Sequence, residues 1–180
     1  MKKMYSLHTL WADEPRHEAC FLELYYDCKY VAMIILESEN QKPDIEFPSK
    51  EYEETMIVRH IGLDCFLQLL EIGIEEFQKS YPLSIDECTL LTNIHMRYSE
   101  ESEKENRKLG LYFNEKLIAH LVMESSTADA ILEFPPRDYP EEIVLRRIDL
   151  CCFQKFLEMC EKTIRCTTRY LCDTKEKKTI

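Results

Sequence analysis

The spacing of hydrophobic residues predicts a series of strands in the first part of the chain. Apolar and aromatic side chains are closely spaced there, and short polar segments separate the runs. Asp27-Cys28 has the length of a tight hairpin turn, with an aspartate in its first place. Five strands are expected, at residues 4–11, 21–26, 29–37, 44–47 and 55–61.

The pattern takes on a helical period after residue 62. Apolar residues then form one stripe, made of Leu63, Phe66, Leu67, Leu70, Ile74 and Phe77. This predicts an amphipathic helix over about 62–79. A second stripe, made of Leu150, Phe153, Leu157, Cys160 and Ile164, predicts another helix over about 149–166. Asp149 is placed to cap the N-terminus of that helix.

The second half of the chain repeats the first at an offset of 87 residues. Residues 24–71 align with residues 111–158 without a gap, and 18 of the 48 pairs are identical. Chance would give about three identical pairs, at a match rate of roughly 6% for average composition. The strands and the helix of the first half therefore have counterparts 87 positions later.

We predict a tandem duplication with an α+β fold. Each unit, residues 1–87 and residues 88–174, would hold about five antiparallel strands followed by one helix, and a charged tail, 175–180, follows them. Two units are too few for a solenoid. They are expected to pack in one globular body as an intramolecular pseudo-dimer that shares one sheet or stacks two.

The net charge is −11 and it is unevenly distributed. Residues 1–87 carry a net −10 and residues 88–174 a net −3, while the tail adds +2. An acidic surface repels phosphate backbones, so we expect no nucleic-acid partner. The same electrostatic field would speed association with a basic protein.

Targeting segments and a disulfide framework are not recognisable in the sequence. The longest apolar run covers residues 30–36, which is far too short to span a membrane, and no signal peptide precedes it. Three of the nine cysteines fall in the first unit and six in the second, so the units share no disulfide pattern. We therefore expect free thiols, a cytoplasmic location and no membrane partner.

No motif for catalysis, a cofactor or a metal ion is recognisable. The three glycines, Gly62, Gly73 and Gly110, are too scattered for a phosphate-binding loop. The cysteines include no CxxC pair, so a structural zinc site is not expected. We therefore assign no catalytic residue, no metal ligand and no cofactor.

Two kinds of polar residue recur in both units and define a candidate site at their junction. His8 and His95 stand 87 positions apart and would act as ligands or proton donors if they met across the junction. Arg59 and Arg146 each recur with two glutamates. Either an anion clamp with acid–base groups or a structural ion pair between the last strand and the helix would explain them. The glutamates are Glu54 and Glu71 in the first unit, and Glu141 and Glu158 in the second.

Our first functional hypothesis is a non-catalytic interaction module of an inhibitor or immunity type, which covers a basic protein with its acidic first unit. The residues expected to meet the partner's arginines and lysines are Glu51, Glu53, Glu54, Glu75 and Glu76. The alternative is a small-ligand-binding protein or enzyme with its site between the units. That site would be lined by His8, His95, Arg59, Arg146 and paired aromatic residues such as Tyr25/Tyr112 and Tyr52/Tyr139.

Overall fold

The chain folds into two antiparallel sheets and two long helices, which confirms the predicted α+β class. The computed structural model describes residues 6–12, 19–37, 42–81, 93–98, 106–124 and 130–176. The first sheet has the strand order β1 (Leu7–Ala12), β2 (Cys20–Tyr26), β3 (Lys29–Leu36), β4 (Asp44–Glu46) and β10 (Arg147–Asp149). The second sheet has the order β5 (His60–Gly62), β9 (Ala130–Glu133), β8 (Lys116–Glu124), β7 (Asn106–Phe113) and β6 (Ile94–Tyr98).

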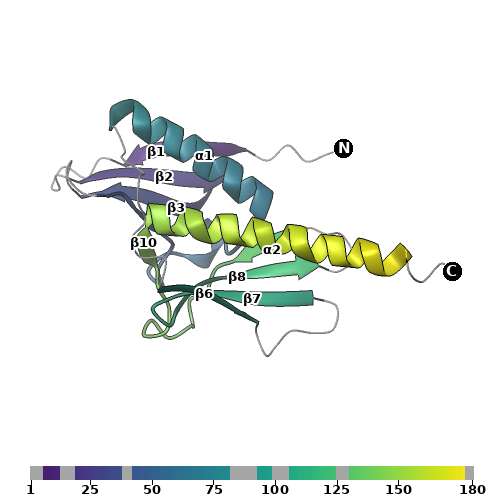
Figure 1. Cartoon of the computed structure of the whole chain (residues 1–180). Coiled ribbons are helices and arrows are strands. Elements are labelled where there is room, and N and C mark those ends of the chain that lie inside the picture. The colour runs from purple at the N-terminus through teal and green to yellow at the C-terminus, as the bar shows by residue number, and fades with distance from the viewer. Residues whose placement is uncertain are drawn as a thin grey trace.

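The two helices begin within one residue of their predicted starts. Helix α1 (Leu63–Ser80) follows β5, and α2 (Leu150–Glu176) follows β10 and extends beyond its predicted end. Asp149 caps α2 by accepting a hydrogen bond from the Cys152 N–H at 3.0 Å. Figure 1 shows both helices on the same side of the sheets, with α1 over β1 and β2. Neither helix is long and apolar enough, over its described residues, to cross a membrane.

The two sheets share one pairing register when residue numbers are shifted by 87. Each central hairpin carries an irregularity at the same place, directly after Leu24 in one and Leu111 in the other. Both hairpin turns place two residues at positive φ, Asp27-Cys28 and Asn114-Glu115. This is the conformation of a two-residue hairpin turn, so the predicted turn is confirmed.

The last strand of each half joins the sheet of the other half. β5 pairs with β9, and β10 pairs with β4. Next to these strands, the Phe47 N–H donates to the Arg146 carbonyl and the Phe134 N–H to the Arg59 carbonyl, both at 2.7 Å. Backbone hydrogen bonds therefore connect the halves in both directions, and each sheet is complete only with a strand from the other half.

The prediction of a strand at 55–61 was wrong in its extent. Residues 54–56 form a short 3₁₀ helix, η1 (Glu54–Met56), and pairing begins only at β5. Between them Ile57 and Val58 are buried, and Ile57 forms a parallel bridge with Tyr30 of β3. The alternating pattern belongs to an extended segment that leaves the first sheet and enters the second.

Four phenylalanines fill the centre of the molecule. The rings of Phe47 and Phe134 stack at 4.6 Å, and those of Phe66 and Phe153 meet edge-on at 5.8 Å. All four side chains are buried. Because they come from both halves and from both helices, one hydrophobic core spans the whole described structure.

Candidate functional site

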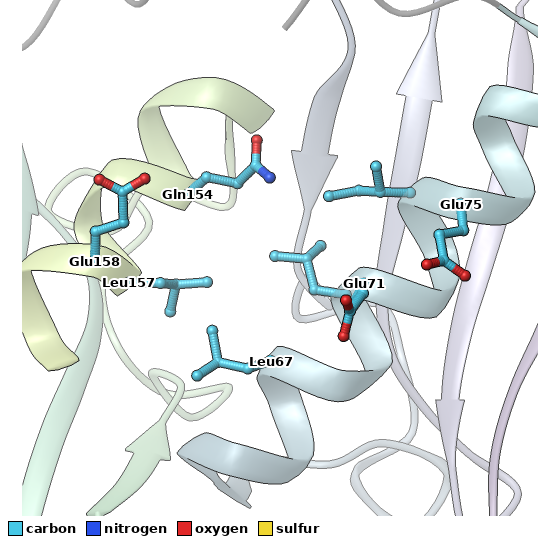
Figure 2. A pocket seen from close by; sticks show the side chains of 8 residues that line it. Leu67, Glu71, Glu75, Gln154, Leu157 and Glu158 are labelled. Atoms are coloured by element: carbon cyan, nitrogen blue, oxygen red, sulfur yellow. The ribbon is translucent and has the colours of Figure 1, made fainter.

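The two helices border a hollow where the halves meet. It has a volume of about 360 Å³ and is lined by Leu67, Leu70, Glu71, Ile74, Glu75, Gln154, Leu157 and Glu158. Figure 2 shows Leu67 and Leu157 pointing into the space between the helices, with Glu71, Glu75 and Glu158 around it. The hollow is therefore apolar at its floor and negative at its rim. None of the histidines and arginines predicted for a junction site lines it.

His8 and His95 are not brought together. They lie on β1 and β6, the outer strands of two different sheets. Each ring stacks on a cross-strand tyrosine, His8 on Tyr25 at 5.1 Å and His95 on Tyr112 at 5.4 Å. Within the described structure, the buried Nδ1 of His8 makes no hydrogen bond, and Nε2 of His95 lies 3.5 Å from Glu115 Oε1 without meeting hydrogen-bond geometry. The two histidines therefore belong to two separate aromatic pairs.

Arg59 holds the loop that precedes it. Its side chain is 9% exposed, and its Nε and Nη2 donate to the Glu54 carboxylate at 3.1 and 2.8 Å. Its Nη1 donates to the Pro48 carbonyl at 3.1 Å. The hydrogen bonds from Arg59 lower the pKa of Glu54, and slight burial opposes them. The fork-like geometry with two bonds to one carboxylate is that of a structural ion pair.

Arg146 makes a similar but looser set of contacts. It donates to the Pro135 carbonyl at 2.9 Å and to Glu141 at 3.2 Å. The expected ion pair is thus present in both halves, but it ties each arginine to the preceding loop. The prediction that these arginines pair with Glu71 and Glu158 on the helices was wrong, because those glutamates line the hollow between the helices instead.

The face of the first sheet that points away from α1 carries another group of polar side chains. Leu24 lies against Gly73 of α1, so its neighbours Glu23 and Tyr25 point to the opposite face. The pairing register places Glu23 and Glu46 on either side of Met33. We define the acidic–aromatic patch as Glu23, Tyr25, Tyr30, Glu46, Glu51 and Tyr52.

Aromatic contacts hold this patch together. The rings of Tyr25 and Tyr30 meet edge-on at 6.0 Å, and those of Tyr30 and Tyr52 stack at 4.9 Å. The Tyr25 hydroxyl donates to Glu23 at 2.7 Å. Glu51 precedes Tyr52 in the chain, and its charge acts on the Tyr52 phenol, so we count it with the patch. The rings and carboxylates therefore form one surface.

The carboxylate of Glu46 is not neutralised by its neighbours. Burial raises its pKa, and the charge of Arg147 offsets this only in part. Arg147 donates to Asp44 at 2.7 Å and to Glu37 at 2.6 Å instead. Burial and the Glu23 carboxylate also raise the pKa of Tyr25 to about 12, so that phenol keeps its proton. The patch is thus a negative surface with neutral hydrogen-bonding phenols.

The equivalent face of the second sheet carries its own cations. The Arg97 guanidinium lies 5.5 Å from the centre of the Tyr112 ring, and the Lys108 ammonium lies 2.9 Å from Glu133. Burial acts to raise the pKa of Glu133, but the hydrogen bond and charge of Lys108 outweigh it, so the pKa is lowered. Tyr112 and Glu133 correspond to Tyr25 and Glu46 at the offset of 87.

The first sheet has apolar residues where the second has these cations. Leu10 stands in place of Arg97, and Phe21 in place of Lys108. Glu23 and Glu46 were not among the residues singled out from the sequence, although the alignment of the repeats held a signal. It has apolar residues in the first half opposite two cations in the second, beside a tyrosine and a glutamate that are the same in both halves.

The five glutamates predicted to meet a partner fall into two groups. Three are exposed in the loop between β4 and β5, namely Glu51, Glu53 and Glu54, and Glu75 and Glu76 lie on α1. Glu54 is held by Arg59, and Glu76 by Lys79 at 2.6 Å. Since Glu51 adjoins the face opposite α1, the five do not form one surface.

Metal and thiol chemistry find no support in the geometry. Among the described residues, no group of three His, Cys, Asp or Glu side chains is arranged to hold a metal ion. Burial raises the pKa of Cys160 to about 12, and burial together with Asp64 raises that of Cys65. Thiols of this kind are packed rather than nucleophilic.

Carboxylates beside aromatic rings are groups that bind cations. The patch therefore has the kinds of group that can hold a cation. No protein-family model, curated protein or solved structure matches the chain.

Proposed function

We propose that the chain is a non-catalytic interaction module of the cytoplasm that binds a basic protein through the acidic–aromatic patch, as an inhibitor or immunity-type protein would. The observation that carries this proposal is the difference between two equivalent sheet faces. In the second sheet Arg97 lies over Tyr112 and pairs with Glu115, and Lys108 pairs with Glu133. The first sheet has Leu10 and Phe21 in place of the two cations, and Cys28 in place of Glu115. Cations of a partner protein would complete the first face.

We also propose that the two halves arose by tandem duplication and pack as an intramolecular pseudo-dimer. The 18 identical pairs, the shared registers and the reciprocal exchange of β5 and β10 support this origin. In a duplicated scaffold one copy can keep a neutralised surface while the other acquires an interface. The net −10 of residues 1–87 fits that division, since it would speed the approach of a basic partner.

A ligand site in the hollow between α1 and α2 is the second candidate function. Three features of the hollow favour ligand binding there: a volume of about 360 Å³, an apolar floor and the carboxylates of Glu71, Glu75 and Glu158. Glu71 and Glu158 are a repeated polar pair on its lining, but it ranks second because the repeated histidines and arginines, His8, His95, Arg59 and Arg146, do not line it.

The test compares two triple variants that remove the same charge from different surfaces. Glu23→Gln/Glu46→Gln/Glu51→Gln alters the patch, and Glu71→Gln/Glu75→Gln/Glu158→Gln alters the hollow. The full chain is used to isolate partners from the native cell at low and at moderate salt. The association rate of the purified partner is then measured with each variant. We expect the patch triple to slow association roughly tenfold, and the hollow triple to slow it less than about twofold.

Thermal unfolding of both triples first establishes that they are folded. A basic partner whose association slows as salt rises, and slows further in the patch triple, supports the proposal because exposed charges are screened by salt. A larger effect of the hollow triple would favour the second candidate. A partner without an excess of basic residues would overturn the proposal.

A further inference from the structure

The second sheet shows how a cation sits on this kind of face. Arg97 of β6 pairs with Gly110 of β7, and its guanidinium lies over Tyr112, two residues along β7. The same guanidinium donates to the Glu115 carboxylate at 2.7 and 2.9 Å. A Cβ at position 110 would lie 2.5 Å from the Tyr112 ring, so the glycine lets that ring lie across the strand. Diagonal cross-strand contacts of this kind are within reach of long side chains.

The first sheet repeats this strand register without the cation, and it has Glu23 in place of Gly110 and Cys28 in place of Glu115. Leu10 of β1 pairs with Glu23 of β2, and Tyr25 stands two residues along β2. The Leu10 side chain is 56% exposed, so a group that approaches from solvent can reach this position. A cation here would meet a carboxylate in addition to the tyrosine, because Glu23 replaces Gly110.

Tyr30 gives an independent sign that the patch receives a polar group. Its side chain is 5% exposed, and its buried hydroxyl has Tyr52 beside it as a hydrogen-bonding neighbour but makes no bond of full hydrogen-bond geometry to any described residue. Burial and Tyr52 raise the pKa of this phenol most strongly, and the charges of Glu46 and Glu23 add to their effect. An unsatisfied buried hydroxyl costs free energy that a hydrogen-bond donor from a ligand would recover.

We propose that the patch binds an arginine side chain of the basic partner, which rests on the function proposed above and names the group recognised. The guanidinium lies against Tyr25, as Arg97 lies against Tyr112, and donates to the carboxylates of Glu23 and Glu46 on either side of Met33. Arginine suits this surface better than lysine because its plane stacks on a ring while its five N–H groups reach several acceptors.

The first experiment titrates the full chain with N-acetyl-arginine amide and follows the patch tyrosines by NMR. The citrulline analogue has the same shape without the charge and serves as the matched ligand. We expect the arginine derivative to bind weakly, at about millimolar concentration, and the citrulline derivative to bind at least about tenfold more weakly. Equal binding of the two, or shift changes centred on Glu71 and Glu158, would overturn the proposal.

The second experiment introduces a cation on the patch by substitution. Leu10→Arg places a guanidinium at the position that corresponds to Arg97, beside Tyr25 and Glu23. It should weaken binding of the arginine derivative at least about tenfold, whereas Leu10→Gln should change it less than about twofold. Both variants should fold because Leu10 is exposed. Undiminished binding to Leu10→Arg would contradict the proposed site.

The same variants separate this inference from the proposed function. If the basic partner binds Leu10→Arg as well as the unmodified chain but loses affinity for the patch triple, the interaction role stands and the arginine site fails. If the arginine derivative binds the patch and no basic partner exists, the arginine site stands and the interaction role fails. Loss of partner binding in Leu10→Arg but not in Leu10→Gln supports both.

Discussion

The outer faces of the two sheets have the same backbone register, but the pKa values of two equivalent carboxylates, Glu46 and Glu133, are shifted in opposite directions. Glu133 pairs across its sheet at the positions that correspond to those of Glu46. Lys108 neutralises Glu133 at 2.9 Å, whereas Phe21 stands at the corresponding place near Glu46. Burial consequently raises the pKa of Glu46, while the pKa of Glu133 is lowered. On the first face the cation opposite Glu46 is Arg147, which donates to Asp44 and Glu37 and therefore offsets the burial of Glu46 only in part.

The centre of the molecule shows the reverse, since the residues there are the same in both halves. Phe47 and Phe66 meet their counterparts Phe134 and Phe153 in one cluster. Identity between the halves thus marks positions that hold the fold. Differences at positions that share a backbone environment mark where the chemistry of the two halves has separated, and this makes Leu10, Phe21 and Glu23 informative.

The largest effect is expected in the shared core, where the halves should behave alike. Phe66→Ala and Phe153→Ala should each lower the free energy of unfolding by about 3–5 kcal/mol, because each empties part of the same cluster. Denaturant unfolding should show one transition in both variants, since exchanged strands connect the halves. A loss below about 1 kcal/mol in either variant would mean that its helix does not share the common core.

A smaller and unequal effect is expected at the buried arginines. Arg59→Met should cost about 2 kcal/mol, because two hydrogen bonds to Glu54 and one to Pro48 are lost. Arg146→Met should cost about 1 kcal/mol, since its Nε has no hydrogen bond to any described residue. Denaturant midpoints of the two variants compare them directly. Equal losses would show that the second bond to the carboxylate adds nothing to stability.

Much of the fold could be predicted because the signals are local. Residues 31–36 are apolar on both faces and lie in the central strand β3, and the two-residue turns and the cap at Asp149 follow from side-chain chemistry. The exchange of β5 and β10 could not be predicted, because a three-residue strand has the same pattern in either sheet. Only the long-range pairing distinguishes them, and local periodicity does not report it.

The candidate site could be predicted only in part. The acidic character of the first half and the glutamate at 51 pointed toward the patch. Glu23 and Glu46 were missed because their importance depends on the strand order that brings Met33 between them. The arginines were misleading for a related reason. Their repetition with several glutamates suggested a binding or acid–base site, but each arginine pairs with a glutamate of the loop that precedes it, Glu54 or Glu141.

Glu133→Gln tests the neutralised face. The pKa of Glu133 is lowered in the folded protein, so its ionised form contributes stability above the unfolded carboxyl pKa and loses it as pH falls through the folded pKa. The substitution should therefore cost about 0.5–1 kcal/mol at neutral pH and almost nothing in acid. Thermal unfolding across this range measures the difference. A cost that does not change with pH would assign the loss to packing instead of charge.

Glu46→Gln should have the smallest effect and the opposite sign. The pKa of Glu46 is raised in the folded protein, so the native state holds its proton more tightly than the unfolded chain, and stability falls as pH rises through that window. Removing the charge should therefore stabilise the protein at neutral pH, by about 0.5 kcal/mol or less because the group is only partly buried. The gain should shrink in acid, with Glu133→Gln as the matched control.

If the patch binds arginine, the same variant should bind the arginine derivative more weakly, since the carboxylate that destabilises the free protein is the one that receives the cation. Destabilisation at neutral pH would instead mean that Glu46 already has a cationic partner in the native chain, and the contrast between the two faces would then be lost.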